Sequence, residues 1–577
     1  MPARRGVWLV LSLIAVAIVI STAGVLLTSY FATRGTGVPS STALVLRLGG
    51  DIAEVEGAGL IDRFVEGPPT VRSLVRAIRR ARTDDRVKAL IVQPAARTPF
   101  WAKTQEIRDA ILDFRQTGKK TIAFLEYGGE QEYFLATACE RIALLPTSVL
   151  DLKGLAMYEV FLRGTLDKVG VYPDLLHIGD YKTAINTFTE KGFTPAHREM
   201  TESLNRDAFD QLVDTIAEAR KKSAEELRAL IDQGPFLPEE ALRTGLVDEL
   251  AYRDEVEEQA GIEDLEPTDI VDYARAIERG FRLRRGTRMA LIYAVGTIAP
   301  GESPAGDFAG SESLVKYIEE ARDDESIKAI VLRVDSPGGS SIASDVIWRA
   351  LMLAREQKPL IVSMGDLAAS GGYYIAMAGD VIVAQPGTLT GSIGIFSGKM
   401  VTEGTLQKIG ANVEGVSAGR FADMNSPTRR YSPEERSKIE EQMQAFYDQF
   451  VEKVAEARKS TPEKIDAIAQ GRVWTGRQAK ELGLVDELGG LERAIQIAKE
   501  RAKIPVGDEV QLVIYPPKPS ILQALSHPFG QAEEVRTRAA LSLIPAAERR
   551  ILQQLGASLR LLRQGEPLAL MPYVFLN

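Results

Sequence analysis

The chain has 577 residues, too many for one hydrophobic core, so we expect two or more domains. Its 45% hydrophobic and 26% charged residues are typical of a globular protein. A net charge of −9 without a long basic block argues against nucleic-acid binding. The single cysteine, Cys139, excludes an intramolecular disulfide, and a total of three histidines excludes a histidine-rich metal site.

The N-terminus carries a candidate membrane anchor. Arg4 and Arg5 precede an uncharged apolar run over residues 7–27, long enough to cross a bilayer as a helix. The preceding positive charges predict a cytoplasmic N-terminus over residues 1–6 and a single transmembrane anchor over residues 7–29. The remaining chain is then an extracytoplasmic body at the inner (plasma) membrane. A cleaved signal peptide is the competing interpretation, but the run is long for one and the cleavage signal is poor.

After a polar linker the chain runs twice through one pattern. The segments ARTDDRVKALIV and ATACERIALLP recur as ARDDESIKAIVL and AMAGDVIVAQP at an offset of 240 residues (321 − 81 and 376 − 136), and TGLVDEL recurs as LGLVDEL. Three blocks in order at nearly one offset indicate two related domains. We predict an N-terminal copy over residues 43–285, a C-terminal copy over residues 288–505 and a helical tail over residues 506–577.

Within each copy, apolar β-branched strands alternate with amphipathic helices. In the second copy, KAIVLRV and KPLIVSMG are typical of buried strands. The residues between these segments have apolar positions near the 3.6 period, which predicts a helix. This order predicts an α/β class with largely parallel, buried strands in each duplicated unit. A long amphipathic helix follows in both copies, opened by Thr194-Pro195 in the first and Ser432-Pro433 in the second.

The first copy contains a candidate general base. Lys182 lies in HIGDYKTAINTF, a segment of low charge, and the residue 240 positions later is Ala422. A lysine acts as a base when burial lowers its pKa toward neutrality. A solvated surface lysine is the simpler interpretation of Lys182 taken alone. His177, five residues earlier, is formally possible as a base, but nothing else in the sequence supports it.

The second copy contains a candidate oxyanion site in RVDSPGGS. Gly338 and Gly339 follow a strand, and glycines there let the backbone approach a ligand with its N–H groups. The first copy has QPAARTP at this place. An ordinary strand-to-helix turn is the competing interpretation, because Asp-Ser-Pro-Gly is also favourable turn chemistry.

The same copy contains a candidate nucleophile, Ser370, in LAASGGYY. Small neighbours leave its hydroxyl uncovered, and the helix that begins there favours developing negative charge. Ordinary helix capping is the favoured interpretation of such a serine when it is taken alone. The first copy, however, has Glu130 at this position. One copy thus has the lysine and the other the serine, which predicts a composite site between them.

The motifs DSPGG, GDLAASGGYYIAMAGD and TLTGSIG, together with GDYKTA in the first half, resemble those of the signal peptide peptidase A family in its long, duplicated form. The resemblance implies a crotonase/ClpP-like fold in each copy and a membrane-bound serine endopeptidase with a Ser/Lys dyad. It also implies a homo-oligomer, a tetramer, that encloses a bowl-like chamber. The serine of the family falls on Ser370, the lysine on Lys182, and the oxyanion glycines on Gly338 and Gly339.

The leading hypothesis is therefore a protease that degrades signal-peptide remnants and other apolar peptides without a metal or cofactor. A crotonase-like acyl-CoA or thioester enzyme is the second hypothesis, because glycine N–H pairs also polarise thioester carbonyls. An extracytoplasmic location, where CoA is not expected, argues against it. A catalytically silent membrane scaffold is the third.

Overall fold

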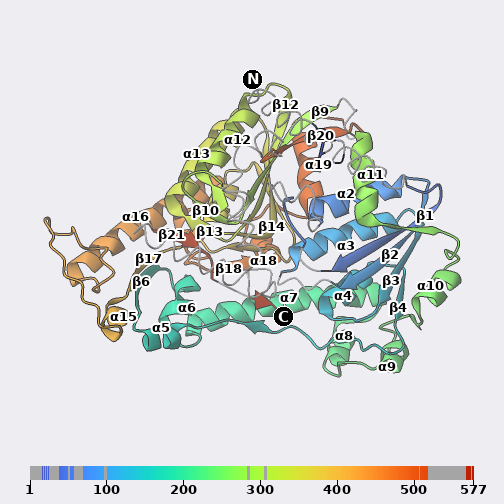
Figure 1. Cartoon of the computed structure of the whole chain (residues 1–577), viewed down its shortest axis with the longest axis horizontal. Helices are drawn as coiled ribbons and strands as arrows, with labels where there is room; N and C mark the ends of the chain where they lie inside the picture. The colour runs from blue at the N-terminus through green and yellow to red at the C-terminus, as the bar shows by residue number, and fades with distance from the viewer. Residues whose placement is uncertain are drawn as a thin grey trace, which may run out of the picture.

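The computed structural model describes residues 38–49, 52–56, 69–95, 100–281, 286–303, 308–505, 507–517, 567–572 and 575–576, with isolated positions between 16 and 24 (Figure 1). Apart from those positions, the predicted anchor at residues 7–29 lies outside the described residues. Over the described part of the chain, no helix combines the length and the apolar character needed to cross a bilayer. Most of the predicted helical tail, residues 518–566, also lies outside the described residues. What is described of the tail forms strands.

The first copy is built on a six-stranded sheet in the order β7-β4-β3-β2-β1-β8, in which every neighbouring pair is parallel. Its strands are β1 (Thr42–Gly49), β2 (Val87–Ala95), β3 (Lys120–Leu125), β4 (Arg141–Leu144), β7 (Glu249–Leu250) and β8 (Glu266–Asp269). Its helices are α2 (Val71–Arg82), α3 (Ala102–Arg115), α4 (Glu130–Ala136), α7 (Pro195–Arg220), α8 (Ala224–Ile231), α9 (Pro238–Arg243), α10 (Arg253–Gln259) and α11 (Ile270–Phe281). The predicted α/β class is thus confirmed for this half.

The second copy is built on an eight-stranded sheet with β14 and β12 at its centre. Its strands are β9 (Thr287–Val295), β12 (Ile327–Ser336), β14 (Leu360–Ala369), β15 (Val381–Ala384), β16 (Leu389–Gly391), β18 (Val473–Thr475), β19 (Glu487–Leu488) and β20 (Val510–Tyr515). Its helices are α12 (Ser311–Asp323), α13 (Ser341–Arg355), α14 (Gly371–Ala376), α15 (Glu403–Lys408), α16 (Pro433–Ala457), α17 (Pro462–Asp466), α18 (Gly476–Glu481) and α19 (Leu491–Arg501). Only β18 pairs antiparallel among the described strands of this sheet.

The duplication extends to individual side-chain contacts. The hydroxyl of Tyr133 donates to the carbonyl of Leu246, and the hydroxyl of Tyr373 donates to that of Leu484 at the same place in the second copy. An arginine–aspartate pair closes the neighbouring strand end in both halves, Arg220–Asp248 and Arg458–Asp486. Such repeated buried contacts support the predicted duplication, while the predicted domain boundaries stay predictions.

A third sheet joins the two copies and the tail. Its order is β11-β10-β13-β21-β17-β6, with β11 (Phe308–Gly310), β10 (Thr297–Ala299), β13 (Gly338–Ser340), β21 (Leu568–Leu570), β17 (Ile395–Val401) and β6 (Tyr172–Ile178). β6 comes from the first copy and pairs antiparallel with β17 of the second. The segment on either side of β6 contains β5 (Met157–Tyr158), α5 (Arg163–Val169), the 3-10 turn η2 (Thr183–Ile185) and α6 (Asn186–Thr189). β5 pairs with β22 (Phe575–Leu576).

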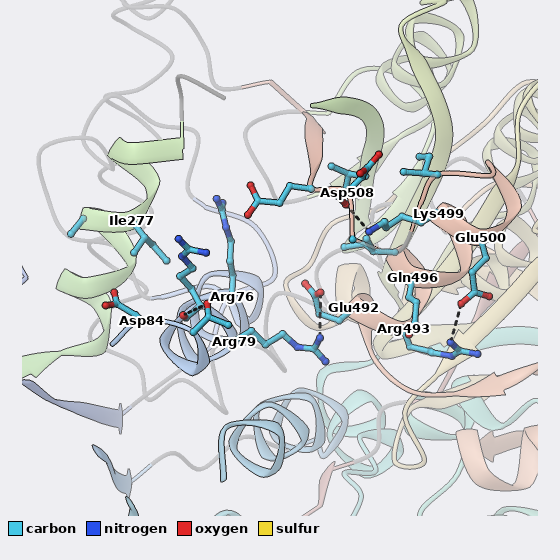
Figure 2. A pocket seen from close by; sticks show the side chains of 18 of the residues that line it. Arg76, Arg79, Asp84, Ile277, Glu492, Arg493, Gln496, Lys499, Glu500 and Asp508 are labelled. Carbon is cyan, nitrogen blue, oxygen red and sulfur yellow. Dashed lines mark hydrogen bonds and ion pairs between the residues drawn. The ribbon is translucent and has the colours of Figure 1, made fainter. Parts of the chain in front are cut away.

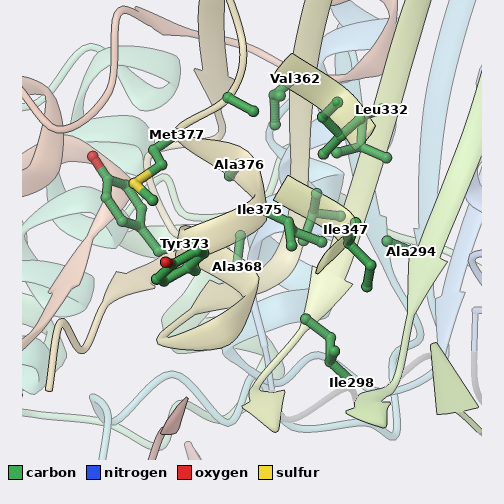
Figure 3. Packing of buried hydrophobic residues seen from close by; sticks show 14 of the residues in the cluster. Ala294, Ile298, Leu332, Ile347, Val362, Ala368, Tyr373, Ile375, Ala376 and Met377 are labelled. Carbon is green, nitrogen blue, oxygen red and sulfur yellow. The ribbon is translucent and has the colours of Figure 1, made fainter. Parts of the chain in front are cut away.

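The core of the second copy lies directly behind Ser370. Tyr373, Ile375 and Met377 point from α14 and the turn after it into a cluster that includes Leu332 and Ile347 (Figure 3). All five side chains are at most 1% exposed. This packing anchors α14 against β12 and α13, so the start of α14 has a fixed position.

A cleft of about 990 Å³ separates α2 and α11 of the first copy from α19 and β20 of the second (Figure 2). Its lining is strongly charged, and oppositely charged side chains pair across or beside it, as Arg79 does with Glu492 and Asp113. Neither Ser370 nor Lys182 lines this cleft. The chemistry predicted from the sequence therefore lies elsewhere.

We expect the Leu332→Ala variant to lower the free energy of unfolding by about 2–5 kcal/mol, because it leaves a cavity under α14. The midpoint of denaturant unfolding of the full chain in detergent measures this loss. Leu237→Ala is the matched control, since Leu237 is 58% exposed and its truncation is expected to change the value by less than about 0.5 kcal/mol. Equal losses for both variants would contradict the described core.

Candidate active site

Ser370 stands at a sharp turn between β14 and α14. Its φ of +56° lies in the left-handed region, where a residue other than glycine is strained. The turn is held by two backbone bonds: Ser370 N donates to Gly391 O (2.7 Å), and Tyr374 N donates to Ser370 O (2.8 Å). The side chain is fully buried. A strained turn with a fixed backbone presents the hydroxyl in one direction.

Lys182 reaches Ser370 from the first copy, just after β6. Its Nζ lies 2.7 Å from Ser370 Oγ, and the whole residue is buried. The backbone of the lysine segment packs tightly on the second copy, where Tyr181 N donates to Gln470 O at 2.9 Å. A Cβ at Gly471 would lie 2.4 Å from Lys182 N, so only glycine permits this approach. The structure thus brings together the two residues that the sequence predicted to share a site.

Burial lowers the pKa of Lys182 well below its ordinary value of 10.5, because desolvation disfavours the charged form. The lysine has a third polar neighbour, Ser392, whose carbonyl and hydroxyl oxygens lie 2.9 and 3.0 Å from Nζ. A neutral amine has two N–H donors and one lone pair. When both donors bind Ser392, the lone pair is left to accept the hydroxyl proton of Ser370.

Ser392 was missed by the sequence reasoning, although it lies within the TLTGSIG motif that was noted there. Its role depends on a side-chain contact across two copies, which no local pattern reports. His177, the alternative base, is exposed, and its Nδ1 bonds the carbonyl of Gly179 in its own segment.

The two glycines of β13 lie beside the nucleophile turn. Gly338 and Gly339 have φ values of +99° and +156°. A Cβ at Gly338 would lie 2.7 Å from Gly371 N, the N–H that follows Ser370. Gly338 N itself donates to Ser336 Oγ at 3.1 Å. The N–H of Gly371 is therefore a further candidate oxyanion donor that the sequence reasoning did not name, with Gly339 as its partner on β13.

The tail strand β21 runs antiparallel along the glycine strand. Gly339 lies opposite Ala569, and Met571 N donates to Pro337 O at 2.9 Å. The carbonyl oxygen of Ala569 would lie 2.1 and 3.2 Å from Cβ atoms built on Gly338 and Gly371. Thus the extended tail segment, residues 568–570, lies where the N–H groups of β13 and the N–H of Gly371 converge.

A buried ion cluster connects the first copy to the strands that carry the site. Lys103 of α3 lies 2.9 Å from Asp335 and 3.1 Å from Asp366. Asp335 precedes the glycine strand and Asp366 lies four residues before Ser370. Although burial alone raises the pKa of Asp335, Lys103 holds it below its usual value. Both carboxylates also accept backbone N–H bonds, from Leu367 and from Lys103 itself.

A second group extends this cluster. The fully buried Arg333 of β12 pairs with Glu54 at 2.8 Å and Glu106 at 2.6 Å, both from the first copy. Burial raises the pKa of Glu106 to about 7, an effect that Arg333 opposes and Glu54 increases. Removing one partner from such a network leaves an uncompensated buried charge, so the network makes the docking of the two copies specific.

Comparisons with known proteins show the family to which the chain belongs. The chain matches the family described as "Peptidase family S49" in two segments, residues 113–264 and 352–505. It is 35% identical to the chloroplastic serine protease SPPA of Arabidopsis thaliana over 84% of this chain and 72% of that protein. It is 35% identical to Protease 4 of Salmonella typhi over 84% and 80% of the two chains, and 29% identical to Protease 4 of Haemophilus influenzae over 81% and 80%.

We expect Lys103→Met to destabilise the folded chain by about 3–5 kcal/mol, because Asp335 and Asp366 then remain buried without their cation. Thermal unfolding of the full chain measures the loss. Lys153→Met is the matched control: Lys153 pairs with Asp151 but its side chain is 57% exposed, so we expect little change in stability. A loss for Lys103→Met no larger than that of the control would show that the cluster does not hold the copies together.

Proposed function

Since the chain belongs to peptidase family S49 and is a serine peptidase, we propose that Ser370 is its nucleophile and Lys182 its general base. The observation that carries this proposal is the buried 2.7 Å contact between Lys182 Nζ and Ser370 Oγ. A lysine that is desolvated this completely favours its neutral form, and a neutral amine next to a hydroxyl is the arrangement that activates a serine.

The reaction follows from these groups. The lone pair of Lys182 takes the hydroxyl proton as Ser370 Oγ attacks a peptide carbonyl, and Ser392 holds the amine in place through two hydrogen bonds. The Lys182 ammonium then returns the proton to the leaving amine, and the acyl-enzyme forms. Water attacks this ester with Lys182 again as the base, which releases the acid product and regenerates Ser370.

Negative charge on the tetrahedral oxygen needs preorganised donors. We assign this role to the glycine strand, Gly338 and Gly339, together with Gly371 N. The position of the Ala569 carbonyl between these glycines supports the assignment. Because Gly338 N is bonded to Ser336, the Gly339 and Gly371 N–H groups make the larger contribution.

The proposed substrates are extended apolar peptides, such as signal-peptide remnants. The tail supports this class, because Leu568 and Leu570 pack in an apolar cluster with Leu175, Ile185 and Phe396 while they run beside the glycines. Substrate binding beside the glycines requires that β21 leave this position, because β21 already pairs with β13 there and Ser370 is fully buried. An acyl-CoA substrate is a poorer fit to a groove that pairs backbone to backbone with a peptide strand.

The proposal includes the wider arrangement expected from the sequence. The chain is anchored in the inner membrane by residues 7–29, with a cytoplasmic N-terminus and the catalytic body outside the cytoplasm. Each copy has a crotonase/ClpP-like fold, and four chains enclose the chamber in which peptides are cleaved. The apolar run after Arg4 and Arg5 supports the anchor.

We expect Ser370→Ala and Lys182→Met each to lower kcat by about 10⁴-fold or more on a fluorogenic apolar peptide. Lys182→Arg is expected to be equally inactive, because a guanidinium keeps its proton. His177→Ala is the control and keeps wild-type activity. A dyad variant that cleaves at the wild-type rate would exclude this mechanism, and a wild-type enzyme inactive on all peptides would favour the silent scaffold.

The pH dependence follows from the lowered pKa of Lys182. Only the neutral amine is a base, so kcat/KM rises with pH and levels off above the pKa of Lys182, which lies well below 10.5. Below that pKa the rate falls about tenfold per pH unit, as for one titrating group. The pKa of Lys182 is lower in the folded chain than in the unfolded chain, where it is about 10.5. Between these two pKa values the unfolded chain binds the additional proton, so the stability of the folded state rises with pH in this range. A rate that rises only above pH 10.5 would contradict a desolvated base.

A further inference from the structure

The segment 471–474 of the second copy contacts the lysine side of the proposed dyad. A Cβ at Gly471 would lie 2.4 Å from Lys182 N, so the two backbones lie very close together. The carbonyl oxygen of the next residue, Arg472, accepts the N–H of Ser392 at 2.7 Å. Ser392 in turn binds Lys182 Nζ through two oxygen atoms. The backbone of this segment therefore fixes both the lysine and its hydrogen-bonding neighbour.

The same segment supports the serine side. It continues into β18, which pairs antiparallel with β16 and lies against α7 of the first copy (Figure 1). The ring of Trp474 packs on Gly391, where a built Cβ would lie 2.9 Å from the Cδ1 atom of the ring. The carbonyl of Gly391 holds the strained turn of Ser370 by accepting its N–H at 2.7 Å. A displacement of this segment would thus disturb both ends of the contact between Lys182 and Ser370.

The side chain of Arg472 joins this segment to the first copy. Its Cζ atom lies 4.7 Å from the ring centre of Tyr181 and 4.5 Å from that of Trp474, within the range of a cation–π contact for both rings. Its Nη1 donates to one carboxylate oxygen of Glu199 in α7 at 2.8 Å, and the hydroxyl of Tyr181 donates to the other at 2.9 Å. These two bonds lower the pKa of Glu199. We call these four side chains, drawn from both copies, the clamp.

The clamp lies at the solvent side of a fully buried base. Tyr181 directly precedes Lys182, and Arg472 directly follows Gly471. Lys182 is 0% exposed, whereas the side chain of Arg472 is 17% exposed and that of Glu199 is 57% exposed. Exposure therefore increases from the lysine outward to the clamp, which places the clamp between the lysine and bulk water on this side of the joint.

The sign of the clamp's effect on Lys182 follows from its surroundings. Burial, rather than a neighbouring charge, lowers the pKa of this lysine. Loss of the Arg472 side chain would remove a nearby cation and admit water, and both changes raise the pKa of Lys182. The other titratable side chains on the described elements around the lysine are Asp180, His177 and Tyr181 in its own segment, Glu199 in α7, Asp366 in β14, Tyr447 in α16 and Asp466 in α17.

We propose that Arg472 is a positioning residue for the reaction: held between the two rings and paired with Glu199, its guanidinium keeps Lys182 against Ser370 and away from water. The inference rests on the proposed function, because it assigns a role in the activation of that dyad. Arg472 does not touch the reacting atoms. It acts through the residue before the lysine and through the backbone that holds Ser392.

The pH profile of the full chain in detergent tests this role. For Arg472→Ala, we expect the rising limb of kcat/KM on a fluorogenic apolar peptide to move at least about 1 pH unit toward alkaline pH, because full burial can shift a pKa by several units. The rate on that limb then falls about tenfold, while the plateau above the new pKa changes much less. A variant with a lower plateau and an unmoved limb would show a merely structural role and overturn the proposal.

Arg477→Ala is the matched control. Arg477 of α18 also pairs across the copies with a residue of α7, Asp207, at 2.8 Å, and its side chain is 28% exposed. It does not contact the lysine segment in the described part of the chain. We expect a comparable drop in the thermal unfolding temperature for both variants and an alkaline shift for Arg472→Ala alone. An equal shift in both variants, or in neither, would overturn the assignment.

Arg472→Lys separates charge from stacking. Lysine keeps the cation but lacks the flat face that contacts two rings, so we expect this variant to keep most of the alkaline shift of Arg472→Ala. A wild-type pH profile for Arg472→Lys would show that the charge acts without the clamp, and the proposal would be wrong.

Hydrogen–deuterium exchange separates this inference from the proposed chemistry, because it needs no activity. The N–H of Tyr181 donates to Gln470 O and that of Ser392 to Arg472 O, so both report on the joint. We expect Arg472→Ala to speed their exchange at least about tenfold relative to Arg477→Ala. Unchanged exchange would overturn the clamp even in an active enzyme. A wild-type chain inactive on all peptides would instead contradict the proposed function, and the exchange rates would then decide on the clamp alone.

Discussion

The desolvation of one lysine is the constraint on which the rest of the structure depends. Lys182 is fully buried and has Ser370 and Ser392 as its hydrogen-bonding neighbours at Nζ. Burying an amine without a counter-ion is costly for its charged form, and this cost lowers the pKa of Lys182 so that the amine is neutral and its lone pair is available. The lysine can be buried only because the two copies dock closely, which explains the glycine at position 471 and the backbone bond between Tyr181 and Gln470.

The docking of the two copies in turn depends on charged side chains that are buried, whereas charged side chains in proteins are usually exposed. Lys103, Arg333 and their carboxylate partners lie between the copies, and they hold the ends of β12 and β14, the strands that lead to the glycines and to the nucleophile. Such a network contributes little net stability compared with an apolar core, but it tolerates only one arrangement. A site whose proposed nucleophile and base come from different copies needs that specificity. The cluster therefore holds the two copies together without touching Ser370 or Lys182.

The tail takes part in the same arrangement. Strand β21 pairs antiparallel with β13 on one side and with β17 on the other, so a segment from the C-terminal end of the chain lies between the glycine strand and the strand that contacts β6. An extended segment therefore fits beside these glycines by backbone pairing.

The amino-acid sequence by itself determined the α/β class, the duplication and the family resemblance, because strand and helix periodicity and repeated blocks are local properties of the chain. It also indicated Ser370, Lys182 and the two glycines, because their reciprocal presence and absence is visible at one offset. Only the tertiary structure decided that Ser392 contacts Lys182 and that Gly371 N lies beside the glycine strand. Only the tertiary structure also decided that Lys103 and Arg333 lie between the copies and that residues 568–570 form a strand beside the glycines. The physical reason is that most of these features arise from contacts between segments more than 200 residues apart, and their energies depend on burial, which only the packed chain creates.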